Sequence, residues 1–378
     1  MVNGSLMRLI FQAWILSIIL VLIVPGVQAS QNPEGPDETV KIGLLIPDNR
    51  SMAARHGAEM AIRKANDKGG FSGRPFQLVV RSMEGAWGTG SKEAVNLIFE
   101  EEVWAIMGSH NGRNAHLVEQ VTTKARIVFL SAWASDPTLS QAFVPWYYSC
   151  VPNDLQQAVA LIEEIYNKRR INKVAAVSDN DYDSKLALKS FVNKTKLAGK
   201  ADPLQFFYDN SSQDFNDLAD QINKADVNCI ILFGQPSASL KLIQQIRQRK
   251  MSQPVFGSLS VLGENELSDQ ELKNYESVVL VFSGDWLKSK GLAFRQEFQR
   301  IYGNTPDAVA AYAYDGMTII IDAIRNAGLD RDKIQISMTK IQYEGVTGPI
   351  QFDDKGNRQG APELMEIKNG IPVAVGRD

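Results

Sequence analysis

The chain has 378 residues, enough for two domains of about 150 residues each. Its composition is ordinary for a globular protein, and its formal net charge is −3. It has no basic patch interleaved with aromatic residues. These properties argue against binding to nucleic acid or to an anionic membrane through positive charge.

The first thirty residues have the parts of a secretory signal peptide. Arg8 supplies a positive charge, AWILSIILVLIV forms an apolar core, and Val27 and Ala29 stand at the −3 and −1 positions of a cleavage site. We therefore expect residues 1–29 to be a cleaved signal peptide that directs the chain to the periplasm. An uncleaved anchor helix is the alternative. No later stretch reaches the roughly 18 apolar residues of a spanning helix, so we expect a soluble, monomeric mature chain.

Apolar runs and helical patterns alternate along the first half of the chain. The pattern predicts strands over 40–46, 75–80, 103–108 and 125–131, and helices over 51–66, 91–102 and 113–124. Strands that alternate with helices of about 10–15 residues are typical of parallel βαβ units. The fold class is therefore α/β.

One connection in this half resembles a phosphate-binding loop. The stretch GAWGTGSKE covers residues 85–93 and has the glycine spacing of G-x-x-x-x-G-K-[ST]. In that motif the lysine follows the last glycine directly, whereas here Ser91 precedes Lys92. The swap rotates each side chain by about 100° around the helix. We interpret the stretch as an ordinary loop with Ser91 near the N-cap of the next helix.

The alternation breaks over 137–152 and then restarts. The second half predicts helices over 154–167, 184–197, 214–225 and 238–248, and strands over 173–178, 203–208, 228–234, 254–258 and 277–283. Two sets of doubly wound units therefore lie end to end. Each sheet should place its ligand crevice at the carboxyl ends of its strands, so two facing lobes would share one cleft.

The chain offers little material for a metal site or for catalysis. It has two cysteines and three scattered histidines, so we expect no metal and no cofactor. Export permits a disulfide between Cys150 and Cys229, but Cys229 lies in the apolar run CIILF, which favours two buried thiols. No G-x-S-x-G or H-E-x-x-H motif is present, and we expect no enzyme activity. An exported enzyme on a flavodoxin-like scaffold is an alternative that turnover of a bound solute would favour.

Several segments are similar to known proteins. The run N-D-K-G-G-F-S-G-R over 66–74 resembles the type I periplasmic binding proteins, and more narrowly the branched-chain amino acid (Leu/Ile/Val-type) ABC transporter solute-binding family. Further resemblance lies in residues 40–47, 91–112, 127–140, 173–188, 310–324 and 345–360. The similarity runs from about Val40 to the C-terminus.

The resemblance implies two doubly wound parallel-sheet lobes joined by a three-segment hinge. The first lobe would comprise 40–149 plus 284–362, and the second 150–283 plus 363–378. The lobes of such proteins close on ligand by hinge bending.

The resemblance also places ligand contacts on two loops of the first lobe. The loop GSHNG brings Asn111, Gly112 and Arg113 to a helix N-terminus, where free N–H groups attract a carboxylate. The family usually has a serine at the position of Gly112. The loop SAWASDP brings Trp133, Ala134 and Ser135 to the pocket, and Trp133 stands where the family usually has a small residue.

On the second lobe the resemblance gives Tyr182 the role of covering the ligand. Ser237 stands where a pocket-lining tyrosine is common, and Leu259 where an acid usually holds the ligand ammonium group. A buried ammonium without a charge partner is costly. Asp285 is one candidate replacement, beside Asp48, Glu84 and Asp181. We therefore expect a small carboxylate or amide with an apolar or aromatic body, rather than leucine, isoleucine or valine.

The function that the resemblance implies is solute binding. The chain would deliver a small carboxylate, amide or amino-acid-like ligand to the membrane permease of an ABC importer, and it would have no nucleic-acid partner. The alternative is a ligand-sensing receptor subunit that acts on a separate membrane partner.

Overall fold

The computed structural model describes residues 39–49, 51–108, 111–141, 144–209, 211–263, 269–282 and 289–375. The predicted signal peptide and Asp285 lie outside these ranges. Within them, no helix is both long enough and apolar enough to cross a membrane.

The first sheet has five strands in the order β2-β1-β3-β4-β5, and every pair is parallel. The strands are β1 (Val40–Ile46), β2 (Phe76–Ser82), β3 (Ala105–Gly108), β4 (Val128–Ser131) and β5 (Tyr147–Ser149). The central strands are buried along nearly their whole length, as their continuous apolar runs predict for a sheet covered on both faces.

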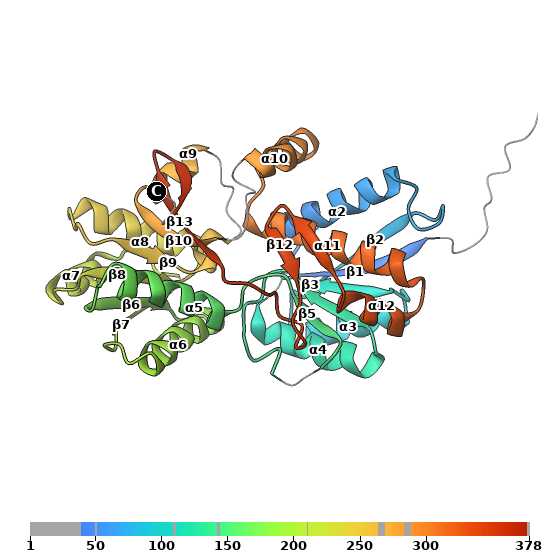
Figure 1. The fold of residues 1–378 in the computed structure, drawn as a ribbon, viewed down its shortest axis with the longest axis horizontal. Coiled ribbons are helices and arrows are strands. Elements are labelled where there is room, and N and C mark those ends of the chain that lie inside the picture. The colour runs from blue at the N-terminus through green and yellow to red at the C-terminus, as the bar shows by residue number, and fades with distance from the viewer. Residues whose placement is uncertain are drawn as a thin grey trace, which may run out of the picture. The chain divides into compact units, whose positions relative to one another are not determined.

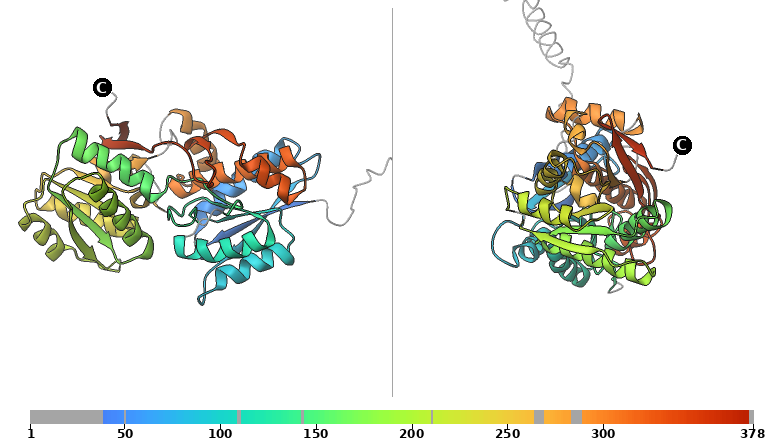
Figure 2. Two further views of the ribbon diagram at one scale, coloured as in Figure 1. Left: turned by 60° about the horizontal axis from the view of Figure 1, so that its bottom comes forward. Right: turned by 90° about the vertical axis from the view of Figure 1, so that its left-hand side faces the viewer.

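Five helices cover this sheet. They are α2 (Met52–Asp67), α3 (Thr89–Phe99), α4 (Gly112–Ala125), α11 (Ala308–Ala327) and α12 (Arg331–Met338). Helices α3 and α4 pack on one face, and α2, α11 and α12 on the other (Figure 1, Figure 2). Helices α2 and α11 approach closely because residue 57 is glycine: a Cβ there would lie 2.2 Å from the Ala310 carbonyl oxygen. We call this sheet and its helices the first lobe.

The second sheet has seven strands in the order β14-β13-β10-β9-β8-β6-β7. They are β6 (Val174–Asp179), β7 (Leu204–Tyr208), β8 (Cys229–Phe233), β9 (Val255–Gly257), β10 (Val278–Phe282), β13 (Glu363–Lys368) and β14 (Ile371–Ala374). Strands β6 to β10 are mutually parallel, but β13 and β14 pair antiparallel. The predicted parallel sheet is thus present, and the chain adds its last two strands to one edge of it as an antiparallel hairpin.

Four helices cover the second sheet, two on each face. Helices α5 and α6 pack on one face, and α7 and α8 on the other (Figure 1). Their bounds are α5 (Asp154–Ile162, continued as the π-helical η1, Glu163–Lys168), α6 (Tyr182–Leu197), α7 (Asn216–Lys224) and α8 (Pro236–Gln248). We call this sheet and its helices the second lobe.

Five further helical or hairpin elements lie in the described residues. They are η2 (Leu259–Leu262), α9 (Asp269–Leu272), η3 (Lys273–Tyr275), α10 (Ser289–Tyr302) and the β11 (Gln342–Gly345) and β12 (Gly348–Gln351) hairpin.

Two segments that connect the lobes run beside each other. The Ser149 N–H donates to the Gly356 carbonyl at 2.9 Å. The Asn153 amide donates to the Asn357 side-chain oxygen at 3.2 Å. These bonds tie the connection after β5 to the connection before β13.

A buried polar network joins residues of 310–324 and 345–360, two of the segments that carry the family resemblance. Both Asp315 carboxylate oxygens accept N–H bonds, from Val346 at 3.0 Å and from Thr347 at 2.8 Å. The Thr347 hydroxyl donates to Asp315 and accepts from Arg358, which also donates to the Cys150 carbonyl at 2.9 Å. Asp315, Thr347 and Arg358 therefore hold these segments together within the first lobe.

Two local predictions have clear outcomes. Cys150 and Cys229 are both free and buried, as predicted. The predicted N-cap at Ser91 is wrong: α3 begins at Thr89, and its N-cap is Gly88 in the left-handed region, with φ 93°. Glycine adopts that conformation without strain, so the helix starts two residues before the serine.

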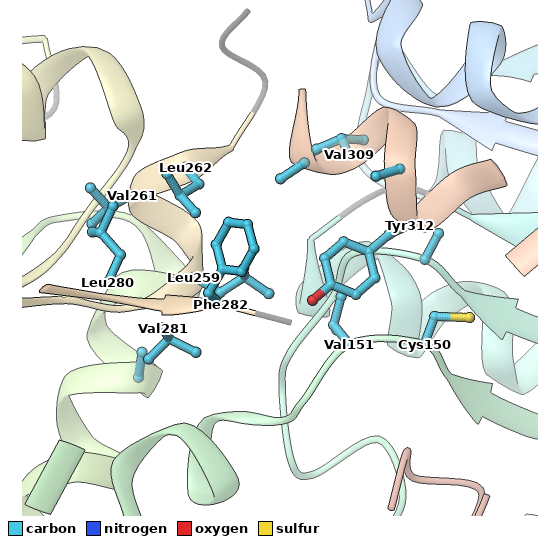
Figure 3. Packing of buried hydrophobic residues seen from close by; sticks show 14 of the residues in the cluster. Cys150, Val151, Leu259, Val261, Leu262, Leu280, Val281, Phe282, Val309 and Tyr312 are labelled. Carbon is cyan, nitrogen blue, oxygen red and sulfur yellow. The ribbon is translucent and has the colours of Figure 1, made fainter. Parts of the chain in front are cut away.

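Apolar side chains from both lobes meet between the sheets. Leu259 and Phe282 come from the second lobe, and Val309 and Tyr312 from α11 of the first (Figure 3). Val151, on the connecting segment, belongs to the same buried cluster. Together these side chains form a buried apolar cluster with residues of both lobes, which we call the apolar floor.

Candidate functional site

The first predicted loop leads directly into α4. Asn111 is the N-cap, and its side-chain oxygen accepts the Asn114 N–H at 3.1 Å. Asparagine favours this position because it satisfies one of the free N–H groups of the first turn. Asn111 is therefore engaged as a cap, and Gly112, the first helical residue, presents the next N–H at the positive end of the helix.

A carboxylate of the second lobe accepts a hydrogen bond from that N–H group. The Gly112 N–H donates to both side-chain oxygens of Asp183, at 3.0 and 3.3 Å. A Cβ at residue 112 would lie 2.7 Å from Asp136 Cβ and 3.0 Å from Asp183 Oδ1. The contact therefore requires glycine, and sequence reasoning missed Asp183 because nothing local in DNDYDS connects it to α4.

The next predicted residue, Arg113, lies between two aromatic rings. Its guanidinium carbon is 5.2 Å from the centre of the Tyr182 ring and 5.8 Å from that of the Trp87 ring. Both distances are typical of cation–π contacts. Trp87, which belongs to the GAWGTG loop, is 71% exposed. The loop that resembled a phosphate-binding motif thus contributes an aromatic rim to the site.

The second predicted loop is held by its own hydrogen bonds. The Ala134 N–H donates to Ser131 Oγ at 3.0 Å, and Ala134 is 2% exposed. Trp133 packs edge-to-face on Tyr312 with ring centres 5.9 Å apart. The Ser135 carbonyl accepts the Asp154 N–H at 2.9 Å. Of the three predicted residues, Ala134 already has its N–H paired inside the loop.

Asp136 links this loop to both lobes. One of its oxygens is 3.2 Å from His116 Nε2 and accepts the Tyr182 hydroxyl at 3.2 Å. The other accepts the Thr138 hydroxyl at 2.6 Å. Tyr182 begins α6 on the second lobe, so this bond and the Gly112–Asp183 bond join the lobes at adjacent points.

Burial and pairing set the charges of this cluster. Hydrogen bonds to Asp136 and Glu119 raise the pKa of His116 to about 9, so the imidazole is protonated at neutral pH. Burial opposes ionisation of Asp136, but bonds from His116 and Thr138 outweigh it and hold the pKa of Asp136 below its ordinary value. Asp136 is therefore a paired anion.

Two other acids of the site are shifted in the opposite direction. Burial raises the pKa of Asp183 to about 7, although the Gly112 N–H opposes the shift. Burial also raises the pKa of Asp154 well above its usual range, with the Ser135 hydroxyl opposing. Asp183 thus titrates near neutral pH, and burial favours the protonated form of Asp154.

The remaining predicted residues lie apart from this cluster. Ser237 is exposed at the second position of α8. It shares a sheet edge with Tyr182, because Asp179 at the end of β6 accepts the N–H groups of Asp181 and Gln235. Leu259 is 3% exposed on the apolar floor. Asp285 lies outside the described residues.

The cluster differs from a metal site, and it lies outside two cavities that the described residues form. In the part of the chain that the structure describes, no group of three or more His, Cys, Asp or Glu side chains could hold a metal ion. Two cavities, of about 670 Å³ beside α11 and α12 and about 380 Å³ between α2 and α10, contain none of the predicted residues. At the cluster, residues of the two lobes are in direct contact, through Gly112 and Asp183 and through Asp136 and Tyr182.

Comparisons with known proteins agree with the fold. A family model described as periplasmic binding protein matches residues 39–369. The Leu/Ile/Val-binding protein homolog 2 of Brucella abortus (strain 2308) is 24% identical over 336 residues, covering 86% of this chain and 89% of the relative.

Two solved structures show the same architecture. The branched-chain amino acid transporter substrate-binding protein LivJ of Streptococcus pneumoniae, in complex with isoleucine, has a TM-score of 0.77 at 20% identity, covering 89% of this chain and 98% of that one. A solute-binding protein of an ABC transporter from R. palustris, in complex with benzoate, has a TM-score of 0.77 at 18% identity, covering 89% and 96%. At these identities the likeness shows the fold.

Proposed function

The chain belongs to the periplasmic binding protein family, and from this premise we propose that it binds a small carboxylate between its lobes and delivers it to the permease of an ABC importer. The proposal covers a carboxylate or amide with an apolar or aromatic body. The predicted contacts are Gly112, Ser135 and Tyr182, with Arg113 and Trp133 at the rim.

One observation carries the carboxylate end of this proposal. The Gly112 N–H, at the N-terminus of α4, already holds a carboxylate, that of Asp183. The Asp183 side chain has the same chemical group as the proposed solute and approaches from the opposite lobe. The helix end therefore presents a donor of suitable geometry toward the space between the lobes.

The body of the solute is inferred from the walls around that donor. Tyr182 contacts Arg113, the residue after Gly112, and Trp133 packs on Tyr312 of the apolar floor. Leu259 is buried on the same floor, where the resemblance gives an acid that pairs an ammonium group. An aliphatic or aromatic body suits such walls, because apolar surface is stabilised by burial. This favours benzoate-like or deaminated acids over amino acids.

We also propose the lobe boundaries 40–149 plus 284–362 and 150–283 plus 363–378, with closure on ligand. In support, β5 ends at Ser149 in the first sheet, whereas β10 ends at Phe282 and β13 begins at Glu363 in the second. The contacts of Gly112 and Tyr182 across the lobes mark where closure would bring the loops together.

The cellular setting follows as part of the same proposal. Residues 1–29 act as a cleaved signal peptide, and the mature monomer works in the periplasm beside a membrane permease. It needs no cofactor or nucleic acid, and it is not an enzyme. N-terminal sequencing of the exported chain should begin near Ser30, and an intact Met1 on membrane-bound protein would contradict this.

The decisive experiment identifies the solute. Mass spectrometry of small molecules released from freshly purified, denatured protein should reveal a carboxylate or amide. Calorimetric titration with benzoate, 4-methylpentanoate and leucine should then rank both acids above the amino acid. Submicromolar binding of leucine, isoleucine or valine would overturn the ligand class, and chemical turnover of the bound molecule would overturn the binding function.

A further inference from the structure

Asp183 accepts a hydrogen bond from the Gly112 N–H, the same donor that we propose for the solute carboxylate. Its two oxygens share the Gly112 N–H at 3.0 and 3.3 Å. One N–H group supports one strong charge-assisted hydrogen bond. A solute carboxylate and the Asp183 carboxylate cannot both hold it.

The residue at position 112 fits Asp183 and leaves no room for a side chain. A Cβ at this position would lie 3.0 Å from Asp183 Oδ1 and 2.8 Å from Asp136 Oδ2. Because residue 112 is glycine, the carboxyl group of Asp183 can lie in the space that a side chain would need. The neighbouring Tyr182 hydroxyl, bonded to Asp136 at 3.2 Å, fixes the start of α6 in the same contact.

We propose that Asp183 is a built-in competitor of the solute: its carboxyl group holds the Gly112 amide across the lobes, and a solute carboxylate binds there only by displacing it. This inference rests on the proposed function, because it concerns the same carboxylate subsite. It adds a residue that sets which solutes bind and under what conditions.

The charges that face Asp183 come from every element packed around it. Asp181 lies at the N-cap of its own helix, Arg113 on α4, Asp136 on the second loop and Asp154 at the start of α5. Asp181 and Asp136 favour the protonated form, whereas Arg113 and the Gly112 N–H favour the ionised form. Burial is the largest influence, and the pKa of Asp183 stands at about 7.

Displacement by a solute is therefore linked to protons. A solute carboxylate beside Asp183 adds a second negative charge and raises the pKa of Asp183 further. Above pH 7 the free protein has lost the Asp183 proton, so binding must take one up. Affinity for a carboxylate should then fall by up to about tenfold per pH unit above 7 and stay level below it.

The contact itself is testable without any solute. Labelling with ¹³C-carbonyl asparagine and ¹⁵N-glycine selects Asn–Gly pairs, of which the chain has three, at 3–4, 111–112 and 369–370. The Gly112 amide should titrate with a midpoint near pH 7 in the wild type and lose that titration in Asp183→Asn. The Gly370 amide, which donates to Glu276 at 3.2 Å, is an internal reference.

Asp181→Asn is the matched control for this measurement. Asparagine keeps the N-cap of α6, and the Asp183 carboxyl group stays in place. Because Asp181 raises the pKa of Asp183, its neutralisation should move the Gly112 midpoint to lower pH without abolishing it. A Gly112 amide that does not titrate between pH 5.5 and 8.5 in the wild type, or titrates equally in Asp183→Asn, would overturn the proposal.

Binding of benzoate, with benzamide as its uncharged analogue, separates this inference from the function it rests on. Wild type should bind benzoate roughly fivefold more weakly at pH 8 than at pH 7, whereas Asp183→Asn should bind equally at both, and at pH 8 more tightly than wild type. Benzamide should show no such dependence.

The failures of the two proposals are distinguishable. If benzoate binds but neither pH nor Asp183→Asn changes its affinity, Asp183 does not compete with the solute and the proposed function stands. If Asp183→Asn weakens binding, Asp183 is a partner of the solute and the inference is overturned. If neither the wild type nor Asp183→Asn binds benzoate, 4-methylpentanoate or leucine, the proposed carboxylate subsite is wrong, and the inference about Asp183 is wrong with it.

Discussion

Asp315 and Asp183 are two aspartates that accept backbone N–H bonds, but they have different surroundings. Asp315 is fully buried inside the first lobe and accepts two N–H groups and one hydroxyl, with Arg358 close by. Asp183 receives one N–H group, that of Gly112, across the lobes.

The difference separates a structural carboxylate from one that can change partners. Every bond of Asp315 belongs to segments of one lobe, so opening of the lobes leaves it intact. The bond of Asp183 exists only while the lobes touch. Its pKa, about 7, makes that bond responsive to protons near neutral pH, as expected of groups at functional sites.

The largest expected effect is on the structural side of this comparison. Asp315→Ala should lower the free energy of unfolding by about 3–5 kcal/mol, because it leaves two N–H groups and the buried Arg358 without their acceptor or countercharge. Urea denaturation followed by circular dichroism measures this. Asp322→Ala, on the solvent side of the same helix, is the control and should cost less than about 1 kcal/mol. Equal losses of unfolding free energy in Asp315→Ala and Asp322→Ala would show that Asp315 has no special structural role.

Gly112→Ala tests the contact between Gly112 and Asp183 by crowding it with a methyl group. The new Cβ would lie 2.7 Å from Asp136 Cβ, and crowding of this kind typically costs about 1–3 kcal/mol. Because Asp136 belongs to the same lobe as Gly112, this clash persists whether or not the lobes touch, and we expect a lower urea midpoint. The new Cβ would also lie 3.0 Å from Asp183 Oδ1 of the second lobe, so small-angle scattering should show a larger radius of gyration as well. An unchanged midpoint would contradict the clash with Asp136, and an unchanged radius would contradict the contact across the lobes.

The pH dependence of stability sharpens the comparison further. The pKa of Asp183 is about 7 in the folded chain and about 3.9 when unfolded. The folded state therefore holds a proton that the unfolded state releases. This stabilisation is fully present below about pH 4 and is lost as pH rises through 7.

Between pH 5.5 and 8 the loss should amount to at most about 2 kcal/mol. Opening of the lobes would relieve part of it. Urea denaturation at both pH values, with Asp183→Asn beside the wild type, measures the difference, which should vanish in the variant. The same pH dependence in both proteins would assign it to another group.

The smallest expected effect concerns two serines of the predicted site. Ser135→Ala should weaken binding of a carboxylate solute by roughly 1 kcal/mol through one lost hydrogen bond. Ser237→Ala, which changes an exposed residue at the start of α8, should have less effect. Calorimetric titration of both variants decides the order. A larger loss for Ser237→Ala would move the solute toward the second lobe.

Much of the fold was predictable because its causes are local. Apolar runs such as CIILF become buried strands, and Asn111 caps α4 through a bond to a residue three positions ahead. Local patterns also explain the two buried thiols. The start of α3 escaped prediction, because a left-handed glycine, rather than a serine hydroxyl, begins that helix.

The candidate site depends on both kinds of information. The sequence by itself predicted that a helix N-terminus follows β3, and the family resemblance predicted that Tyr182 covers the ligand there. Only the tertiary structure decided that Asp183, 71 positions from Gly112 in the chain, takes the N–H at that helix end, and that Trp87 and Tyr182 enclose Arg113. The physical reason is that strand and helix periods record which face of an element is buried. They carry no information about which loop meets which when two lobes come together.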